Sequence, residues 1–329
     1  MDKLGICVVG AGGMIGGRRV NNYQDNPRAE VVAICDVPRE NAEKIAKDAG
    51  ISNVYDNWKE MLGNPDIDAV NVSTPNLFHY EISKAALEAG KHVSTEYPVC
   101  QSVEEYDDLI KTAKRKQLIF HDALTVRNEP HYMAVRDNLS MIGSPVCGRM
   151  NFFGGPAKWY IDPKIRGFMF LCYHIHYVDQ FMGLFGEVSW IDASQMVLKG
   201  KNVHAGTIMM GHKSGAVSYI EFGMGFSPSS APQITIRGDQ GIIRYQTEES
   251  PKKVQILTAA ETKAIIVDKE TMGWTGDVTR VALKAHGDNF IDEVLDGKPS
   301  LNPFEIGRRA IEISLIAEES AAEGKRLNL

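Results

Sequence analysis

Cysteine is scarce in this chain of 329 residues, and no two cysteines have the spacing of a metal-binding or redox pair. The five thiols are Cys7, Cys35, Cys100, Cys147 and Cys172. Their odd number and wide spacing argue against a disulfide framework and against a zinc knuckle. We therefore expect free thiols, no metal site and a reducing, cytoplasmic compartment.

Long apolar runs and a basic excess are also missing. No apolar stretch approaches the roughly 20 residues that a membrane helix needs, and the first residues lack signal-peptide architecture. The formal net charge is −6, and the 36 Lys and Arg residues are spread along the chain. We therefore expect neither a membrane nor a nucleic-acid partner, and look instead for a small-molecule substrate.

What is present is ordinary globular composition. Hydrophobic residues make up 43% and charged residues 24% of the chain. This usage excludes a disordered or fibrous protein. The length suggests about two domains, each large enough to bury a core.

The first third of the chain alternates short apolar runs with helical patterns. The expected strands are 4–9, 30–35, 69–72, 93–95 and 118–120, and the expected helices are 38–49, 58–62, 76–89 and 102–116. Ser102, followed three residues later by Glu105, predicts an N-cap for the last of these helices. Strands that alternate with helices predict parallel βαβ units, and hence a doubly wound α/β sheet.

After residue 123 this rhythm changes. The expected strands are 149–153, 190–197, 205–210, 216–222, 233–237, 241–245, 254–257 and 264–267, and the expected helices are 131–139, 174–185, 277–295 and 303–323. Closely spaced strands of this kind predict a large, mostly antiparallel open sheet in an α+β arrangement. We expect a dinucleotide-binding domain at 1–123 and a substrate-binding and oligomerisation domain at 124–329.

A glycine-rich loop joins the first expected strand to the first helix. Gly10 permits a tight turn, and Gly12 lets the backbone approach a pyrophosphate at the helix N-terminus. The third glycine of the dinucleotide fingerprint is displaced from position 15 to Gly16, so helix–strand packing is expected to differ slightly. The cofactor-binding residues predicted here are Gly10, Gly12, Gly13, Met14 and Ile15.

An acidic residue ends the second expected strand, about twenty residues after the loop. Asp36 is placed to accept hydrogen bonds from a ribose 2′-hydroxyl and to repel a 2′-phosphate, which favours NAD. Arg39 follows closely and could meet that phosphate, so NADP remains the alternative.

Several further segments carry a family resemblance. They are Asn71-Val-Ser-Thr-Pro-Asn76 with His79, Ala89-Gly-Lys-His-Val93, Thr95-Glu96-Tyr97-Pro98, His176-Tyr-Val-Asp179 with Phe185-Gly186, and a tail with His286, Phe290-Ile291 and Gly297-Lys-Pro299. Together they resemble the glucose-fructose oxidoreductase/inositol dehydrogenase/MocA (Gfo/Idh/MocA) family over essentially the whole chain.

This resemblance implies a Rossmann domain, a second domain with a large open sheet, NAD(P), and often a homo-oligomer, here expected as a dimer or tetramer. It adds Ser73, Thr74, Pro75, Asn76, His79 and Glu96 to the predicted cofactor-binding residues. It also places Arg127, Lys158, Trp159, Tyr160 and Arg166 in segments that line the family's substrate cleft.

Two positions depart from the family pattern. The family usually has Glu-Lys-Pro where this chain has Glu96-Tyr97-Pro98, a tripeptide that resembles biliverdin reductase. The family often has an aspartate at the position of Cys172, four residues before its catalytic histidine. The likeness to biliverdin reductase covers only three residues, so we do not expect a bile pigment as the substrate.

The predicted catalytic residues are His176, Asp179 and Tyr97. A histidine suits proton transfer near neutral pH, and Asp179 lies three residues later on a nearby helical face, where it could orient the ring. Tyr97 is a poor base but can donate a hydrogen bond to a carbonyl or developing alkoxide. Tyr97 and His176 are also expected to contact the substrate, as is His174, which replaces a usually small residue.

The leading hypothesis is an NAD(P)-dependent oxidoreductase that transfers a hydride between nicotinamide and a sugar, a cyclitol or a related hydroxy or keto compound. One alternative is NAD-dependent, redox-assisted cleavage of a glycoside, for which Tyr97 would be an altered acid or base. Another is a non-catalytic NAD-binding sensor or co-repressor, suggested by the missing lysine and aspartate.

Overall fold

The computed structural model describes residues 3–155, 169–198, 203–230, 232–246, 252–267 and 278–329. The chain forms two compact units, and each consists of two stretches of sequence. The first unit comprises residues 1–125 and 280–309, and the second comprises residues 126–279 and 310–329. Residues 280–309 thus belong to the first unit although they follow most of the second unit in the sequence. The domain division at residue 123 stays a prediction, because compact units need not fold independently.

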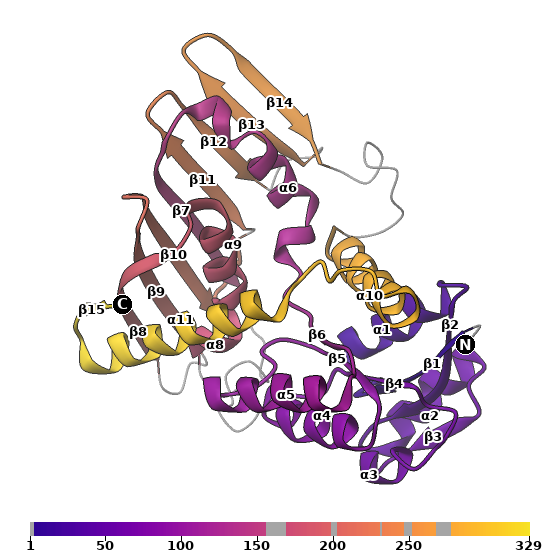
Figure 1. Cartoon of the computed structure of the whole chain (residues 1–329). Helices are drawn as coiled ribbons and strands as arrows, with labels where there is room; N and C mark the ends of the chain where they lie inside the picture. The colour runs from indigo at the N-terminus through magenta and orange to yellow at the C-terminus, as the bar shows by residue number, and fades with distance from the viewer. Residues whose placement is uncertain (1–2, 156–168, 199–202, 231, 247–251, 268–277) are drawn as a thin grey trace. The chain divides into compact units, whose positions relative to one another are not determined.

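The first unit contains a six-stranded, parallel sheet with strand order β3-β2-β1-β4-β5-β6 (Figure 1). Its strands are β1 (Leu4–Val9), β2 (Ala29–Cys35), β3 (Asn53–Tyr55), β4 (Ala69–Val72), β5 (His92–Thr95) and β6 (Phe120–Asp122). Its helices are α1 (Met14–Gln24), α2 (Arg39–Ala49), α3 (Trp58–Met61), the 3₁₀ helix η1 (Asn76–Phe78), α4 (His79–Glu88), α5 (Val103–Lys116) and α10 (Val278–Asp296). The predicted doubly wound α/β sheet is confirmed.

Local chemistry explains these elements. Every residue of β1 is buried, as expected for a central parallel strand that is covered on both faces. The Ser102 hydroxyl accepts a hydrogen bond from the Glu105 amide at 3.1 Å, which confirms the predicted N-cap of α5. The strand expected at 118–120 is wrong by two residues, because β6 includes the buried polar residues His121 and Asp122.

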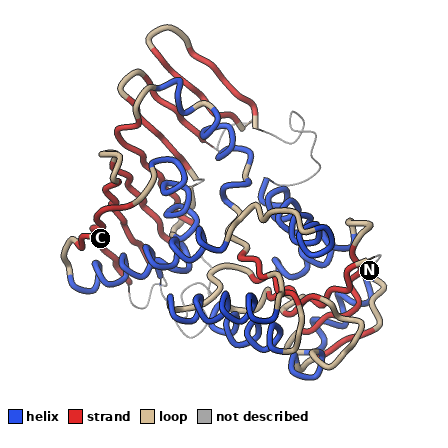
Figure 2. Tube along the Cα trace, in the orientation of Figure 1, coloured by secondary structure: helices blue, strands red, loops and turns tan. Residues whose placement is uncertain are grey.

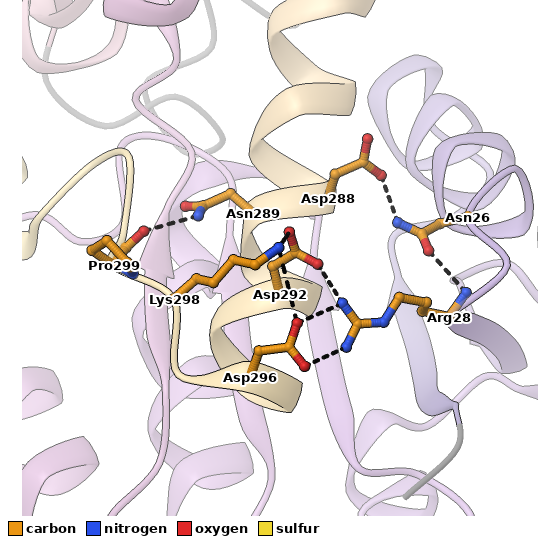
Figure 3. A network of polar contacts seen from close by, with 8 residues as sticks. All are labelled: Asn26, Arg28, Asp288, Asn289, Asp292, Asp296, Lys298 and Pro299. Atoms are coloured by element: carbon orange, nitrogen blue, oxygen red, sulfur yellow. Dashed lines mark hydrogen bonds and ion pairs between the residues drawn. The ribbon is translucent and has the colours of Figure 1, made fainter.

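Polar and apolar contacts attach α10 to the first unit. Phe290 and Ile291 are fully buried and belong to the apolar core around β1 and β2. At the surface, Arg28 donates hydrogen bonds to Asp292 at 2.6 Å and to Asp296 at 2.7 Å (Figure 3). These contacts explain why a segment late in the sequence completes the first unit.

The second unit contains a nine-stranded sheet with strand order β14-β13-β12-β11-β7-β10-β9-β8-β15, drawn in red in Figure 2. Its strands are β7 (Pro145–Gly154), β8 (Val188–Leu198), β9 (Val203–His212), β10 (Val217–Met224), β11 (Gln233–Gly238), β12 (Gly241–Gln246), β13 (Lys253–Thr258), β14 (Thr262–Ile266) and β15 (Leu327–Asn328). All neighbouring pairs are antiparallel except β7 and β10, which run parallel. The expected mostly antiparallel sheet is confirmed.

The remaining elements of the second unit are mainly helices. They are η2 (Val126–Asn128), α6 (Pro130–Asp137), η3 (Leu139–Ile142), α8 (Met169–Tyr173) and α9 (Ile175–Phe185), while α11 (Phe304–Glu323) begins in the first unit and ends in the second. Val178 and Phe181 of α9 and Ile313 of α11 share one apolar core with the buried face of the sheet. The helix expected at 174–185 is wrong at its start, since it begins at Ile175 and a separate helix precedes it.

No helix in the described ranges is both long and apolar enough to cross a bilayer.

Candidate functional site

The glycine loop lies at the carboxyl end of β1, beside the point where the strand order reverses between β1 and β4. Gly10 has a φ of +84°, and a Cβ at this position would lie 2.5 Å from the Ser73 carbonyl oxygen. The Gly10 amide donates to the Cys35 carbonyl at 2.8 Å. The turn is therefore held against the ends of two other strands, at the edge where doubly wound sheets bind ligands.

Helix α1 begins directly after this turn with its amide groups uncapped by a side chain. Gly13 is the N-cap residue, and Met14, the first helical residue, is 68% exposed. Uncapped N–H groups and the positive end of the helix dipole favour a bound anion such as a pyrophosphate. Ile15 is half-buried and lies on the first turn of the same helix.

The close approach of helix to strand is made by Gly16. A Cβ at this position would lie 2.0 Å from the Gly10 carbonyl oxygen, a contact that no side chain could relieve. The displaced glycine thus supplies the tight packing that the fingerprint requires. The neighbouring Gly17 has its nearest non-local atom at 3.6 Å and carries no such constraint.

Asp36 lies at the end of β2 and contacts the glycine loop. The Gly12 amide donates to Oδ2 of Asp36 at 2.7 Å, and a Cβ on Gly12 would lie 2.5 Å from the Cβ of Asn41. Arg39 begins α2 three residues later and donates to Glu43 at 2.9 Å with about half of its side chain exposed. The structure therefore brings together the glycine loop and the carboxylate that the sequence predicts for the ribose.

The segment after β4 is fixed mainly by hydrogen bonds. The Ser73 hydroxyl donates to Asn71 at 2.8 Å. The buried ring of His79 has Nε2 at 2.7 Å from the Thr74 carbonyl oxygen and Nδ1 at 2.8 Å from that of Pro98. Burial lowers the pKa of His79, and the two carbonyl groups oppose that effect. Both ring nitrogens of His79 thus contact carbonyl groups that follow β4 and β5, and its contact with a cofactor stays a prediction.

Two further predicted cofactor residues, Asn76 and Glu96, are buried. Asn76, in η1, is 8% exposed, and Glu96 is 7% exposed. Oε1 of Glu96 accepts a hydrogen bond from Nε of Arg19 at 2.7 Å, and Nη2 of Arg19 lies 2.6 Å from the same oxygen. This carboxylate is therefore committed to an ion pair inside the first unit. Tyr97, the next residue, is half-buried.

The predicted groups of the second unit gather on α9 and on the η2 segment. The buried carboxylate of Asp179 binds the Arg127 guanidinium, with Nε at 2.9 Å and Nη2 at 2.6 Å from Oδ1. Burial raises the pKa of Asp179 to about 6, and the positive charge of Arg127 works against that rise. The structure thus assembles Arg127 and Asp179 into one ion pair, whereas the sequence suggested Asp179 as the partner of His176.

His176 is half-buried on the first turn of α9. Burial lowers its pKa to about 4, and the negative charge of Glu129 opposes that shift. The imidazole is consequently neutral at pH 7 and can accept a proton. Glu129 precedes α6 and lies 3.1 Å from Nδ1 of His131, so a carboxylate that the sequence did not single out acts on this group of histidines.

His174 differs from His176 in its surroundings. Its side chain is fully buried, with the rings of Phe170 and Phe222 at centroid distances of 4.8 and 5.1 Å. Its Nε2 atom lies 3.5 Å from the Gly206 carbonyl oxygen. A core position of this kind does not suit the expected contact with substrate. Cys172 is likewise buried, at 6% exposure, in keeping with a structural thiol.

Four expected substrate-cleft residues lie outside the described residues, namely Lys158, Trp159, Tyr160 and Arg166.

Two charged residues that we consider candidates for a functional role, Arg19 and Glu129, were not predicted from the sequence. Arg19 sits in a helix of ordinary polarity, and no motif distinguishes it from the neighbouring Arg18. Glu129 follows Arg127 in a short polar stretch before a proline. Only the fold reveals that one is a buried cation and the other a neighbour of His176.

Comparison with known proteins gives two family matches. A model described as an oxidoreductase family with an NAD-binding Rossmann fold matches residues 4–123, and one described as a GFO/IDH/MocA C-terminal domain matches residues 141–244. Together they account for well over half of the chain.

Individual relatives are more distant. A 1,5-anhydro-D-fructose reductase of Ensifer adhaerens is 32% identical over 42% of this chain and 40% of its own length. A myo-inositol 2-dehydrogenase of Thermotoga maritima is 23% identical over 99% of this chain and 98% of its own. The alignments span only 40 to 55% of the length of the first curated relatives.

Among solved structures, a levoglucosan dehydrogenase in complex with NADH and levoglucosan superimposes with a TM-score of 0.86. It is 22% identical and covers 99% of both chains. At this identity the likeness establishes the fold.

Proposed function

The chain belongs to the GFO/IDH/MocA oxidoreductase family, and from this premise we propose that it is an NAD(P)-dependent oxidoreductase of a sugar, a cyclitol or a related hydroxy or keto compound. The observation that carries the proposal is the backbone cradle at the end of β1. There, a Cβ on Gly10, Gly12 or Gly16 would collide with the backbone or with a neighbouring side chain. Such a cradle, next to uncapped helical amides and Asp36, fits a dinucleotide.

The residues present fit NAD(P) in a definite way. The uncapped start of α1 would hold the pyrophosphate, and Asp36 would accept a hydrogen bond from the ribose. The Asp36–Gly12 hydrogen bond fixes one carboxylate oxygen and thereby orients the other. Bound NAD(P) supplies the nicotinamide that gives or takes the hydride. We favour NAD because a carboxylate at this place repels a 2′-phosphate, with NADP as the alternative.

The proposed catalytic roles belong to Tyr97 and His176. The neutral imidazole of His176 accepts the proton of a substrate hydroxyl during oxidation and returns it during reduction. The Tyr97 hydroxyl donates a hydrogen bond to the reacting oxygen. Asp179 acts indirectly, because its carboxylate holds Arg127, which we propose as the substrate-binding group. His174 is left out of the proposed site because it is buried in the core.

The first test is cofactor binding to protein that has been freed of nucleotide. NADH and, separately, NADPH are titrated while energy transfer from the four tryptophans to the nicotinamide is followed. Tighter binding of NADH is expected. Tighter binding of NADPH would mean that Arg39 outweighs Asp36, and binding of neither would remove the basis of the proposal.

The second test is a substrate screen that follows NADH absorbance. The compounds named for relatives provide the starting set: 1,5-anhydro-D-fructose, levoglucosan and myo-inositol. Oxidation or reduction of at least one such polyol or sugar is expected. Release of the aglycone from a nitrophenyl glycoside without net NADH formation would instead indicate redox-assisted glycoside cleavage.

We also propose a homo-oligomer in a reducing compartment. Half-buried side chains such as Thr207, Met209 and Tyr219 alternate with the buried ones along β9 and β10, so one sheet face has room for a further layer. All five cysteines are free thiols. Light scattering coupled to size exclusion would give the mass in solution, and a monomer would contradict the oligomer.

A further inference from the structure

One arginine side chain is completely buried in the first unit. Arg19 of α1 has no exposed surface, and it is among the largest side chains in the core. Its Nε and Nη2 atoms face Glu96, while Nη1 donates to the Leu283 carbonyl of α10 at 2.9 Å. The guanidinium therefore connects the helix of the glycine loop with the end of β5 and with α10.

A histidine extends this connection to the end of β6. Nδ1 of His286 lies 3.4 Å from Nη1 of Arg19, and Nε2 lies 3.0 Å from the Asp122 carbonyl oxygen. A neutral ring with its proton on Nε2 accepts from Arg19 and donates to Asp122, so it satisfies both contacts. Burial and the charge of Arg19 hold the pKa of His286 well below its usual range, in agreement with this neutral form.

Stability alone does not account for such an arrangement. Removing two charges from water costs several kcal/mol per ion, and a well-packed apolar pair often stabilises a core equally well. What an ion pair adds is a defined geometry, because Nε of Arg19 donates to Oε1 of Glu96 and Nη2 lies 2.6 Å from the same oxygen, which holds the carboxylate at one edge of the planar guanidinium. The geometry fixed here is that of Glu96, whose amide also donates to the Val72 carbonyl at 2.8 Å.

Glu96 directly precedes Tyr97 in the chain. We propose that Arg19 is a positioning residue that acts through Glu96 to hold the Tyr97 hydroxyl in its working orientation. This inference rests on the proposed function, in which Tyr97 donates to the reacting oxygen. Two guanidinium nitrogens lie at hydrogen-bonding distance from one carboxylate oxygen, and a lysine would supply a single nitrogen there.

The test is a double-mutant cycle. Arg19→Lys is measured in the wild-type and in the Tyr97→Phe background, with a substrate found in the screen, and kcat and KM are determined separately. Arg19→Lys is expected to lower kcat about 10- to 100-fold, as for a misplaced catalytic group, and to leave KM nearly unchanged. In the Tyr97→Phe background its effect is expected to shrink to about twofold, because no hydroxyl remains to be positioned.

Glu96→Gln provides a second variant for the case that Arg19→Lys does not fold, since it keeps the side-chain shape and removes the charge. Arg28→Lys is the matched control, because Arg28 also binds α10 but at the surface. The control is expected to leave kcat unchanged in both backgrounds.

If Arg19→Lys lowers kcat by the same factor in the wild-type and Tyr97→Phe backgrounds, the positioning role is overturned, while the proposed function stays intact. Absence of turnover by the wild-type protein on every substrate would overturn the proposed function, and the inference with it.

Discussion

Arg127 and Asp179 form a tight ion pair in which the guanidinium donates from Nε and Nη2 to a fully buried carboxylate. Nη2 also lies 3.2 Å from the Asp179 backbone oxygen, so the arginine holds both the side chain and the main chain of α9. Asp179 therefore shapes the second unit through Arg127, one helical turn after His176. A carboxylate that the sequence suggested for orienting the histidine instead orients an arginine.

Asp179 makes stability depend on pH in a definite direction. Burial raises its pKa in the folded protein to about 6, against an ordinary value of 3.8. The folded state thus binds this proton more tightly, so the contribution of this group to stability is highest below about pH 4 and falls as the pH rises to about 6. We expect Asp179→Asn to remove this component.

The measurement is urea unfolding of wild-type protein and Asp179→Asn at several pH values between 4 and 7. The difference between their free energies of unfolding should change by at most about 3 kcal/mol over this range, in favour of the variant at the higher pH. A constant difference would show that the carboxyl does not titrate there.

In the proposed mechanism, the protonation of His176 sets the acid limb of the rate profile. With its pKa at about 4, the imidazole stays neutral throughout the physiological range. For substrate oxidation at saturating NAD, the limb of kcat/KM that His176 sets should therefore lie near pH 4. Asp179 titrates at about 6 and holds Arg127, so the profile is measured in Asp179→Asn as well as in the wild-type protein. A limb near pH 6.5 that persists in Asp179→Asn would indicate a solvated histidine and contradict the assignment.

The charge of Glu129 should affect the pH at which this acid limb of kcat/KM lies. Its negative charge raises the pKa of His176, so Glu129→Gln is expected to lower this pKa further and move the limb to more acidic pH. Asp137→Asn is the matched control, because Asp137 is an exposed carboxylate on α6 whose charge does not act on His176. NMR titration of the histidine ring protons, assigned with His176→Asn, measures the same shift without turnover. An unchanged pKa in Glu129→Gln would exclude an effect of that carboxylate.

Two adjacent glycines offer a matched pair for the nucleotide loop. Gly16→Ala would place a Cβ 2.0 Å from the Gly10 carbonyl oxygen, whereas Gly17→Ala has its nearest such atom at 3.6 Å. Alanine favours a helix over glycine by about 1 kcal/mol, so propensity acts equally at both sites. We expect Gly16→Ala to abolish NADH binding and Gly17→Ala to retain it, as judged by nicotinamide fluorescence. Similar affinities for the two variants would contradict close packing at Gly16.

Asp36 should decide the choice of nucleotide. Asp36→Ser removes the charge that repels a 2′-phosphate and weakens the support of the Gly12 amide. We expect NADH affinity to fall about tenfold or more and NADPH affinity to rise relative to it, in line with a hydrogen-bond loss of about 1.5 kcal/mol or more. Arg39→Gln in the Asp36→Ser background should remove the gain for NADPH. An unaltered preference in Asp36→Ser would place the ribose elsewhere.

The parallel sheet was predictable because its strands are short, apolar and bounded by glycine or polar residues. Two of its strands were not predicted correctly: β3 was missed, and β6 was placed at Leu118 to Phe120. His121 and Asp122 are buried there because α10 supplies partners, including a 2.5 Å contact between His121 and Glu293. Those partners are about 170 residues away in sequence, so no local pattern predicts them.

The second unit shows the same limit. Alternating apolar residues predicted the strands of its sheet, but not the parallel pairing of β7 with β10 or the two-residue strand β15, which pairs with Trp190 and Ile191. Within the site, the glycine loop and Asp36 were predictable because their spacing is local. The ion-pair partners of Glu96 and Asp179 were not predictable, because an ion pair between segments far apart in the sequence produces no periodic pattern of residues.

The order in which the two units use the chain has a consequence during synthesis. The segment that supplies Phe290, Ile291 and the His286 partner of Arg19 emerges roughly 165 residues after β6. At about 5 to 20 residues per second, the nascent first unit would wait roughly 8 to 35 s on the ribosome with an uncovered apolar surface and with Arg19 lacking its contacts to α10. Over that interval the growing polypeptide is a client for chaperones, and a messenger truncated before the codons for α10 would yield an aggregation-prone fragment rather than a free nucleotide-binding module.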